Sequence, residues 1–141
     1  MIDERQRDRV ILALEVAVGI MVAYWVAWFV ARSAVASNTT KGYYDFENAF
    51  PLADAWLTLC MASANVTLRR QSSSSLFWLL AGGGAGVYLF CMDVLYDLEH
   101  GIWWKSGGGL IELGINIVTL VFSVWLMRWG WSNRRALLRD G

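Results

Sequence analysis

Residues 76–98 read LFWLLAGGGAGVYLFCMDVLYDL, an apolar run that ends in two aspartates. A helix needs roughly 20 such residues to cross the hydrocarbon core of a membrane. No charge occurs from Ser72 to Met92, whereas a helix of a soluble bundle carries polar side chains at every turn. The stretch therefore predicts a transmembrane helix.

Comparable apolar blocks cover residues 11–31, 50–68 and 108–129, and each contains one acidic residue: Glu15, Asp54 and Glu112. Pro51 suits the first turn of a helix, and the serine-rich link at 71–75 offers N-cap residues for the next one. Together with residues 76–98, these blocks predict an all-α polytopic membrane protein. We expect a single four-helix transmembrane domain over residues 1–141.

The composition supports this class and excludes others. Hydrophobic residues make up 57% of the chain and charged residues 17%, against roughly 45–50% and 25% in soluble proteins, and the mean hydropathy is +0.41. These values argue against a disordered chain, a disulfide scaffold and a basic nucleic-acid-binding module. His100 is the single histidine, and the two cysteines form no C-x-x-C motif. We therefore predict no cofactor and no nucleic-acid partner.

The distribution of charge predicts the orientation. Nine of the twelve basic residues lie in the N-terminal flank, the 69–75 link and the C-terminal segment, which share one side if the chain crosses four times. The positive-inside rule then places both termini and the 69–75 loop in the cytoplasm. The inner half has nine basic and five acidic residues, a net charge of +4, and the outer half has three and seven, a net charge of −4. We expect a multi-pass protein of the cell membrane, in contact with membrane lipid.

One face of the helix at 76–98 combines small and acidic residues. Gly82 and Gly86 form a G-x-x-x-G pair, which lets two transmembrane backbones approach closely. Asp93, Asp97 and His100 continue the same face at helical spacing. We expect this face to point into a helix interface, either inside the bundle or against a second copy or a larger membrane complex through the Gly82/Gly86 face.

Two other helices carry polar stripes that start with an acid near the outer boundary. The first stripe contains Glu112, Asn116, Thr119 and Ser123, and the second contains Asp54, Thr58 and Asn65. At a rise of roughly 1.5 Å per residue, Asp54, Asp93 and Glu112 lie on the order of 6–8 Å below the outer boundary. Ionisable groups at that depth normally face the bundle interior.

These positions predict an acidic pocket that opens outward, with Asp97 and His100 above the three deeper acids. The candidate ligand-binding residues are Asp54, Asp93, Asp97, Glu112, His100, Asn116, Tyr96 and Trp103. Asp45, Glu47 and Glu99 are candidates for its rim.

Clustered acids raise one another's pKa, so such a pocket must hold protons, bind a cation or be covered by Lys41, Lys105 or Arg32. A hard divalent cation would use Asp54, Asp93 and Glu112, because Ca²⁺, Mg²⁺ and Mn²⁺ prefer oxygen ligands. An organic amine is an alternative through cation–π contact with the aromatic side chains. A purely structural alternative is that these acids only form hydrogen bonds at helix ends. Glu15 lies apart from them, and we expect it to form a structural ion pair with Arg9 or Arg128.

Three functions remain open from the residues. The first is binding or transport of a cation, a proton or a cationic amphiphile at the acidic pocket. The second is an accessory or structural subunit of a membrane complex. The third is a small membrane enzyme that acts on a lipid-like substrate by carboxylate acid/base chemistry, which requires a cavity that reaches the apolar mid-plane below the acids.

Two motifs in the middle half of the chain also indicate a small membrane protein. Residues 46–54 contain Phe-Glu and Phe-Pro-Leu-Ala-Asp, and residues 93–103 contain Asp-Val-Leu-Tyr-Asp followed by Gly-Ile-Trp. Their order and spacing resemble a pattern in uncharacterised small bacterial four-helix integral membrane proteins. The resemblance implies a membrane location, places both motifs at the same outer end of the bundle and attaches no activity.

Overall fold

A computed structural model describes residues 2–36, 39–105 and 107–139, and in these ranges the chain is all-helical with no strand. The all-α prediction is confirmed. The four long helices are α1 (Glu4–Val35), α3 (Pro51–Arg69), α4 (Ser75–His100) and α6 (Gly107–Ser132). The three short helices are α2 (Lys41–Glu47), α5 (Ile102–Lys105) and α7 (Arg134–Leu137).

Local chemistry explains several helix ends. Asp3 caps α1 by accepting a hydrogen bond from the backbone N–H of Arg5, and Thr40 caps α2 in the same way. Pro51 is the first residue of α3, a position where a backbone N–H has no acceptor within the helix, so its absence costs no hydrogen bond. Gly101 ends α4 in the left-handed conformation, with a φ of 62°. The serine link differs from the expectation, because Ser74 precedes α4 without a side-chain capping bond.

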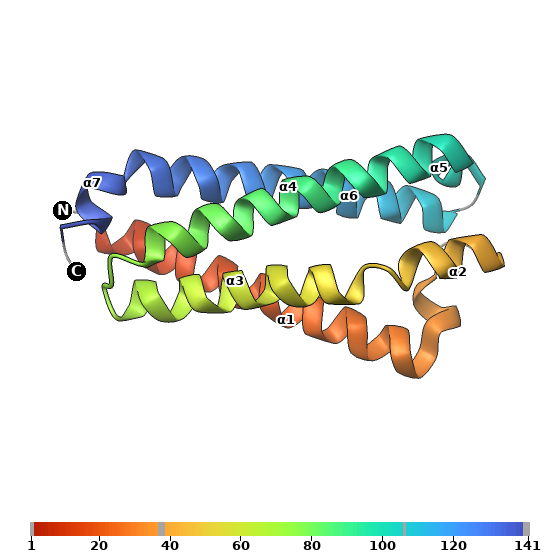
Figure 1. Cartoon of the computed structure of the whole chain (residues 1–141), viewed down its shortest axis with the longest axis horizontal. Helices are drawn as coiled ribbons and strands as arrows, with labels where there is room; N and C mark the ends of the chain where they lie inside the picture. Colours follow the sequence, from red (N-terminus) through yellow and green to blue (C-terminus); the bar gives the residue numbers. More distant parts are fainter. Residues whose placement is uncertain (1, 37–38, 106, 140–141) are drawn as a thin grey trace.

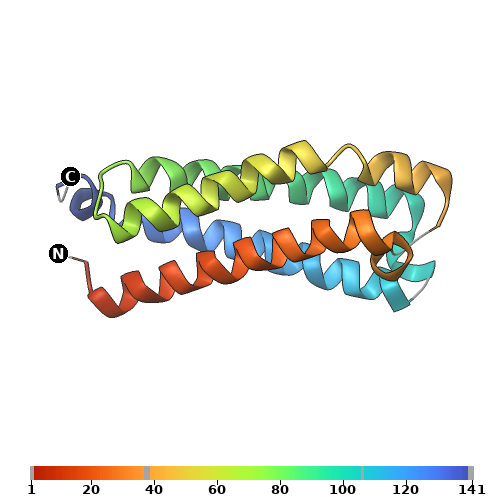
Figure 2. The same cartoon turned by 90° about the horizontal axis from the view of Figure 1, so that it is seen from below.

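The four long helices lie side by side along one axis, and α4 packs against both α3 and α6 while α1 packs against α3 (Figure 1). Both chain ends lie at one end of this bundle, and α2 and α5 lie at the other (Figures 1 and 2). We call these the terminal end and the α2/α5 end. Successive long helices therefore run in opposite directions, which follows from the short links between them.

Glycines on α4 set its distance from both neighbours. A Cβ atom on Gly82 would lie 3.3 Å from the Cβ of Cys60 on α3, and a Cβ on Gly86 would lie 2.1 Å from the Oγ of Ser123 on α6. Gly83 also has no room for a side chain, because a Cβ atom there would lie 2.3 Å from the Cγ of Met127. The G-x-x-x-G face is thus covered by helices of the same chain. A partner could use it only by displacing α3 or α6.

Three of the described helices are long and apolar enough to cross a membrane: α1, α4 and α6. The predicted fourth span corresponds to α3, which is shorter and carries Asp54, Thr58, Ser63, Asn65 and Thr67. Many large apolar side chains face outward on the long helices, among them Val30 on α1 at 82% exposure and Ile111 on α6 at 68%. Such an outward apolar surface is typical of a membrane-associated protein.

Polar contacts at the terminal end join α1 to α3. The side chain of Asn65 donates a hydrogen bond of 3.0 Å to the backbone oxygen of Ile11. Arg69 forms an ion pair with Glu15 and also donates to the amide oxygen of Asn65. Glu15 was therefore correctly expected in an ion pair, but its predicted partners, Arg9 and Arg128, were wrong. Because α3 packs against α1, the side chain of Arg69 lies next to Glu15 and forms the ion pair.

The glycine contacts yield a matched pair of adjacent substitutions. Gly83→Ala places a methyl group against Met127 and the backbone oxygen of Ser123, whereas a Cβ on Gly84 meets no atom within 4 Å. We expect Gly83→Ala to lower the free energy of unfolding by about 1–3 kcal/mol through overpacking. Gly84→Ala should raise it by about 0.5–1 kcal/mol, because alanine favours a helix. Denaturant titration in detergent micelles measures both, and equal effects would contradict the proposed helix contact.

Candidate functional site: an acidic cluster at the α2/α5 end

Three carboxylates from three different helices meet at the α2/α5 end. One carboxylate oxygen each of Glu47 (α2), Asp93 (α4) and Glu112 (α6) lies within 4.8 Å of the other two. Glu47 and Glu112 are buried, with exposed fractions of 7% and 8%, and Asp93 is half-buried. We call these three residues the acidic cluster.

Two tyrosines donate hydrogen bonds to the acidic cluster. The hydroxyl of Tyr24 on α1 donates to Glu47 Oε2 at 3.3 Å, and the hydroxyl of Tyr43 on α2 donates to Glu112 Oε1 at 3.3 Å. Tyr43 itself is only 2% exposed. The helices α1, α2, α4 and α6 thus each contribute a carboxylate or a hydrogen-bond donor to the acidic cluster.

Asp97 lies one turn along α4 from Asp93 and is fully buried, with 0% exposure. Its Oδ2 accepts hydrogen bonds from the indole N–H of Trp103 at 2.7 Å and from the side-chain amide of Asn116 at 3.1 Å. Its Oδ1 has no hydrogen-bond partner among the described residues. The structure therefore brings together the predicted site residues Asp97, Asn116 and Trp103. One buried carboxylate oxygen of Asp97 accepts no hydrogen bond from the described residues.

Asp54 lies near the acidic cluster but is not one of the three carboxylates that come within 4.8 Å of one another. Its Oδ2 accepts a hydrogen bond of 3.1 Å from the indole N–H of Trp25 on α1. The three acids predicted to hold a metal were Asp54, Asp93 and Glu112; in the structure Glu47 takes the place of Asp54. The short helix α2 lies at the α2/α5 end roughly in line with α3 (Figures 1 and 2), and it carries Glu47, which was predicted at the rim, into the cluster.

Tyr96 and His100 form an aromatic stack beside the cluster. The ring of Tyr96 stacks on Phe46 with 3.7 Å between centroids and on His100 with 4.0 Å. His100 is exposed, and its Nδ1 lies 2.9 Å from the backbone oxygen of Tyr96. Asp45 and Glu99 are exposed too. None of these residues is one of the three carboxylates that meet within 4.8 Å.

Basic side chains were one expected way to neutralise these acids. Arg32 instead donates to the side-chain oxygen of Asn48 at 3.4 Å, and its guanidinium lies 5.1 Å from the ring centroid of Trp28 and 5.4 Å from that of Tyr44. Lys41 is exposed. The side chain of Lys105, the third candidate, lies outside the described part of the chain. Glu47 and Asp93 form no ion pair within that part.

Two residues of the site, Tyr24 and Tyr43, were not predicted from the sequence, and Glu47 was predicted at the rim. Tyr24 lies in the middle of an apolar block, and Tyr43 lies outside the four apolar blocks. A usable signal was the spacing of Tyr24 and Trp28, four residues apart on one face of α1. Both side chains donate to groups at the α2/α5 end, since Trp28 donates to Asn48 at 3.3 Å.

Glu47 lies outside the long helices, and its environment changes its proton affinity. Burial raises the pKa of its carboxyl from 4.5 to about 8, with further contributions from the negative charges of Asp93 and Glu112. The hydrogen bond from Tyr24 acts in the opposite direction, because it stabilises the carboxylate. Near neutral pH this carboxyl is therefore mostly protonated.

The raised pKa of Glu47 makes the stability depend on pH. Between about pH 4.5 and 8 the unfolded chain has released this proton and the folded chain has kept it, so the free energy of unfolding falls as the pH rises. We expect Glu47→Gln to raise the melting temperature at pH 8.5 by on the order of 5 °C and to reduce its dependence on pH. Thermal scans in detergent from pH 5 to 8.5 measure this.

Asp45→Asn is the matched control, because Asp45 lies on the same short helix and is exposed. Its melting curve should keep the pH dependence of the parent. The assignment to Glu47 is refuted if both variants follow the parent protein over the whole range.

The chain matches no known protein family, no curated protein and no solved structure in the comparisons made with it. The resemblance to small bacterial four-helix membrane proteins stays a prediction. What the acidic cluster does must therefore follow from its geometry and its chemistry.

Proposed function

We propose that the protein crosses the membrane four times and binds a cation, in exchange with protons, at an acidic cluster that faces the outside of the cell. The observation that carries the proposal is the meeting of Glu47, Asp93 and Glu112, whose carboxylate oxygens lie within 4.8 Å of one another. Each comes from a different helix, so folding itself assembles the cluster.

The way the long helices are connected supports four crossings. α1 ends at the α2/α5 end and α4 begins at the terminal end (Figure 1). α3 is the helix that joins the two ends, and its 19 residues span about 28 Å, close to the thickness of the hydrocarbon core. If α1, α4 and α6 cross the membrane, α3 must cross it with them. Three of its polar side chains, those of Asp54, Thr58 and Asn65, contact α1, which makes them tolerable inside the bundle.

The charge distribution supports cytoplasmic termini. Nine of the twelve basic residues belong to the terminal end, including Arg5, Arg70 and Arg135. The positive-inside rule favours this end in the cytoplasm, which places the acidic cluster on the outer side. Cations outside the cell would then reach the cluster from the aqueous phase.

The topology can be tested with single cysteines in a chain that carries Cys60→Ala and Cys91→Ala. Lys41→Cys should react with a membrane-impermeant maleimide in intact cells, because α2 is expected outside. Ser73→Cys should react only after the membrane is permeabilised, because the link between α3 and α4 is expected inside. The reverse pattern, or labelling of both in intact cells, would reject this orientation.

The spacing of the carboxylates suits a hard divalent cation. Ca²⁺ binds oxygen ligands at 2.3–2.6 Å, so two oxygens on opposite sides of the ion are about 4.8 Å apart. Three carboxylates within this limit provide half of a six-ligand shell, and water or nearby hydroxyls would complete it. Mn²⁺ and Mg²⁺ prefer the same ligand type at shorter distances.

Protons are the natural competitors of such a cation. Three acids so close together cannot all be ionised when the cluster is empty, since each negative charge disfavours the next. Binding a divalent cation removes that repulsion and releases the protons that the empty cluster holds. The protein would thus couple the occupancy of the site to the external pH.

The burial of the cluster favours a small ion over the other two functions. Glu47, Tyr43 and Glu112 are each more than nine-tenths buried, which leaves little room for an amphiphile. An enzyme acting on lipid needs a cavity below the acids, but Gly86 lies directly against Ser123 on that side. An accessory role through Gly82 and Gly86 has little support, because helices of the same chain cover both residues.

Binding of Mn²⁺ tests the proposed site directly. The purified full-length protein in detergent should bind one Mn²⁺ more tightly at pH 8 than at pH 6, as followed by the decrease of the free-ion signal in electron paramagnetic resonance. Asp93→Asn and Glu112→Gln should each weaken binding by about tenfold or more, because the affinity follows the number of charged ligands.

The control variants are Asp45→Asn and Glu99→Gln, which remove exposed acids at the same end of the bundle. They should bind as the parent does. Equal losses in all four variants would indicate nonspecific attraction to negative charge, and unchanged binding in Asp93→Asn and Glu112→Gln would rule the site out.

A further inference from the structure

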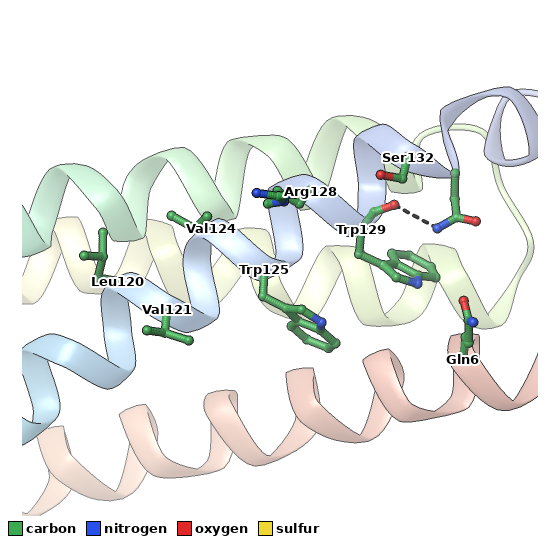
Figure 3. Close-up of a pocket in the computed structure, with 9 residues that line it drawn as sticks. Gln6, Leu120, Val121, Val124, Trp125, Arg128, Trp129 and Ser132 are labelled. Carbon is green, nitrogen blue, oxygen red and sulfur yellow. Dashed lines mark hydrogen bonds between the residues drawn. The ribbon is translucent and has the colours of Figure 1, made fainter.

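An open groove runs between α1 and α6 in the half of the bundle near the terminal end (Figure 3). It encloses about 610 Å³. α4 draws α3 and α6 close to itself, whereas α1 packs mainly on α3 and leaves its seam with α6 open. The groove is thus a consequence of how the four helices are paired.

The wall of the groove changes in character along α6. Leu120, Val121 and Val124 line the part near the middle of the helix, and Arg128, Ser132 and Asn133 line the part near its end. The apolar part faces the depth of the hydrocarbon core, and the polar part lies where α6 leaves it. A ligand that fits this wall needs an apolar chain and a polar or anionic head.

Two indole rings and a glutamine complete the groove. Trp125 and Trp129 project from α6 toward α1, and Gln6 projects from α1 toward them (Figure 3). The Nε1 of Trp129 is buried and has no acceptor among the described residues. Tryptophan is enriched at the level of lipid headgroups, where its N–H can donate to a headgroup oxygen while its ring stays in apolar surroundings.

The length of the groove matches one leaflet of a bilayer. Twelve residues separate Leu120 from Ser132, a rise of about 18 Å along α6. Half of the hydrocarbon core is about 15 Å thick, so the groove extends from near the mid-plane to the headgroup layer. This length matches a single phospholipid better than it matches a water-soluble molecule or another transmembrane helix.

The charge of the groove selects the headgroup. Arg128 is exposed and forms no ion pair within the part of the chain that the structure describes. Two acids of the N-terminal segment, Asp3 and Glu4, line a separate cavity together with Arg5 and Arg7.

We propose that the groove between α1 and α6 binds one anionic phospholipid of the cytoplasmic leaflet, with its phosphate at Arg128 and an acyl chain along Val121 and Val124. Basic sites between helices on the cytoplasmic side are a common way to hold such headgroups. The inference rests on the proposed membrane insertion, which cysteine labelling tests separately, and it is independent of the cation site at the other end.

Native mass spectrometry of the purified full-length protein tests this site. The protein in an uncharged detergent is given equal amounts of phosphatidylglycerol and phosphatidylcholine with the same acyl chains. The parent should retain one phosphatidylglycerol in preference to phosphatidylcholine. Arg128→Gln should lower this preference by about tenfold, as expected for the loss of a charged hydrogen bond.

Arg70→Gln is the matched control, since Arg70 is an exposed arginine at the same end of the bundle and does not line the groove. It should keep the preference of the parent, and Val124→Trp, which fills the apolar part, should reduce the retention of both lipids. Equal retention of the two lipids by the parent would overturn the proposal. An equal loss in Arg128→Gln and Arg70→Gln would overturn it as well, because net charge alone would explain the result.

Discussion

The contact that the rest of the fold depends on is the close approach of α4 to α3 and α6, where glycine stands in place of a larger residue. Gly82 faces Cys60 on one side and Gly86 faces Ser123 on the other, and neither position has room for a further side chain without a shift. In the proposed membrane setting no hydrophobic force would drive one helix onto another, so small-residue contacts of this kind would decide which helices pair. They fix the register of α4, and this register carries Asp93 and Asp97 to the polar stripe of α6.

Burying several carboxylates near one another is unfavourable unless donors or cations accompany them. The chain supplies donors from aromatic side chains: Tyr24 and Tyr43 reach the acidic cluster, and Trp103 reaches Asp97. A hydroxyl or an indole N–H can stabilise a carboxylate while the rest of the ring stays in apolar surroundings. Lysine or arginine in these places would neutralise the acids permanently. Neutral donors keep the carboxylates ordered and leave their charge available to a proton or a cation.

Periodicity in the sequence was enough to predict the parts of this arrangement that lie within one helix. Asn116 and Ser123 were expected on an inward stripe, and both are buried. Features that depend on how helices meet could not be predicted in this way. Glu47 reaches the cluster because the link between α1 and α3 forms the helix α2 at that end, and Glu15 pairs with Arg69 because α3 lies against α1. Spacing along one helix carries no information about such contacts, since they depend on links of irregular structure and on the choice of neighbours.

The same pairing of helices produces both the closed and the open regions of the molecule. Glycine contacts hold α6 against α4, so at the α2/α5 end Glu112 is brought to Asp93 and Asn116 to Asp97. Nothing comparable draws α6 to α1, and their seam stays open where Trp125 and Arg128 line it. A formal net charge of zero conceals this division, because seven of the twelve acids belong to the half with the α2/α5 end and nine of the twelve basic residues to the half with the terminal end. This division of charge is the common basis of the two proposals, a cation in the closed cluster and an anionic headgroup in the open groove.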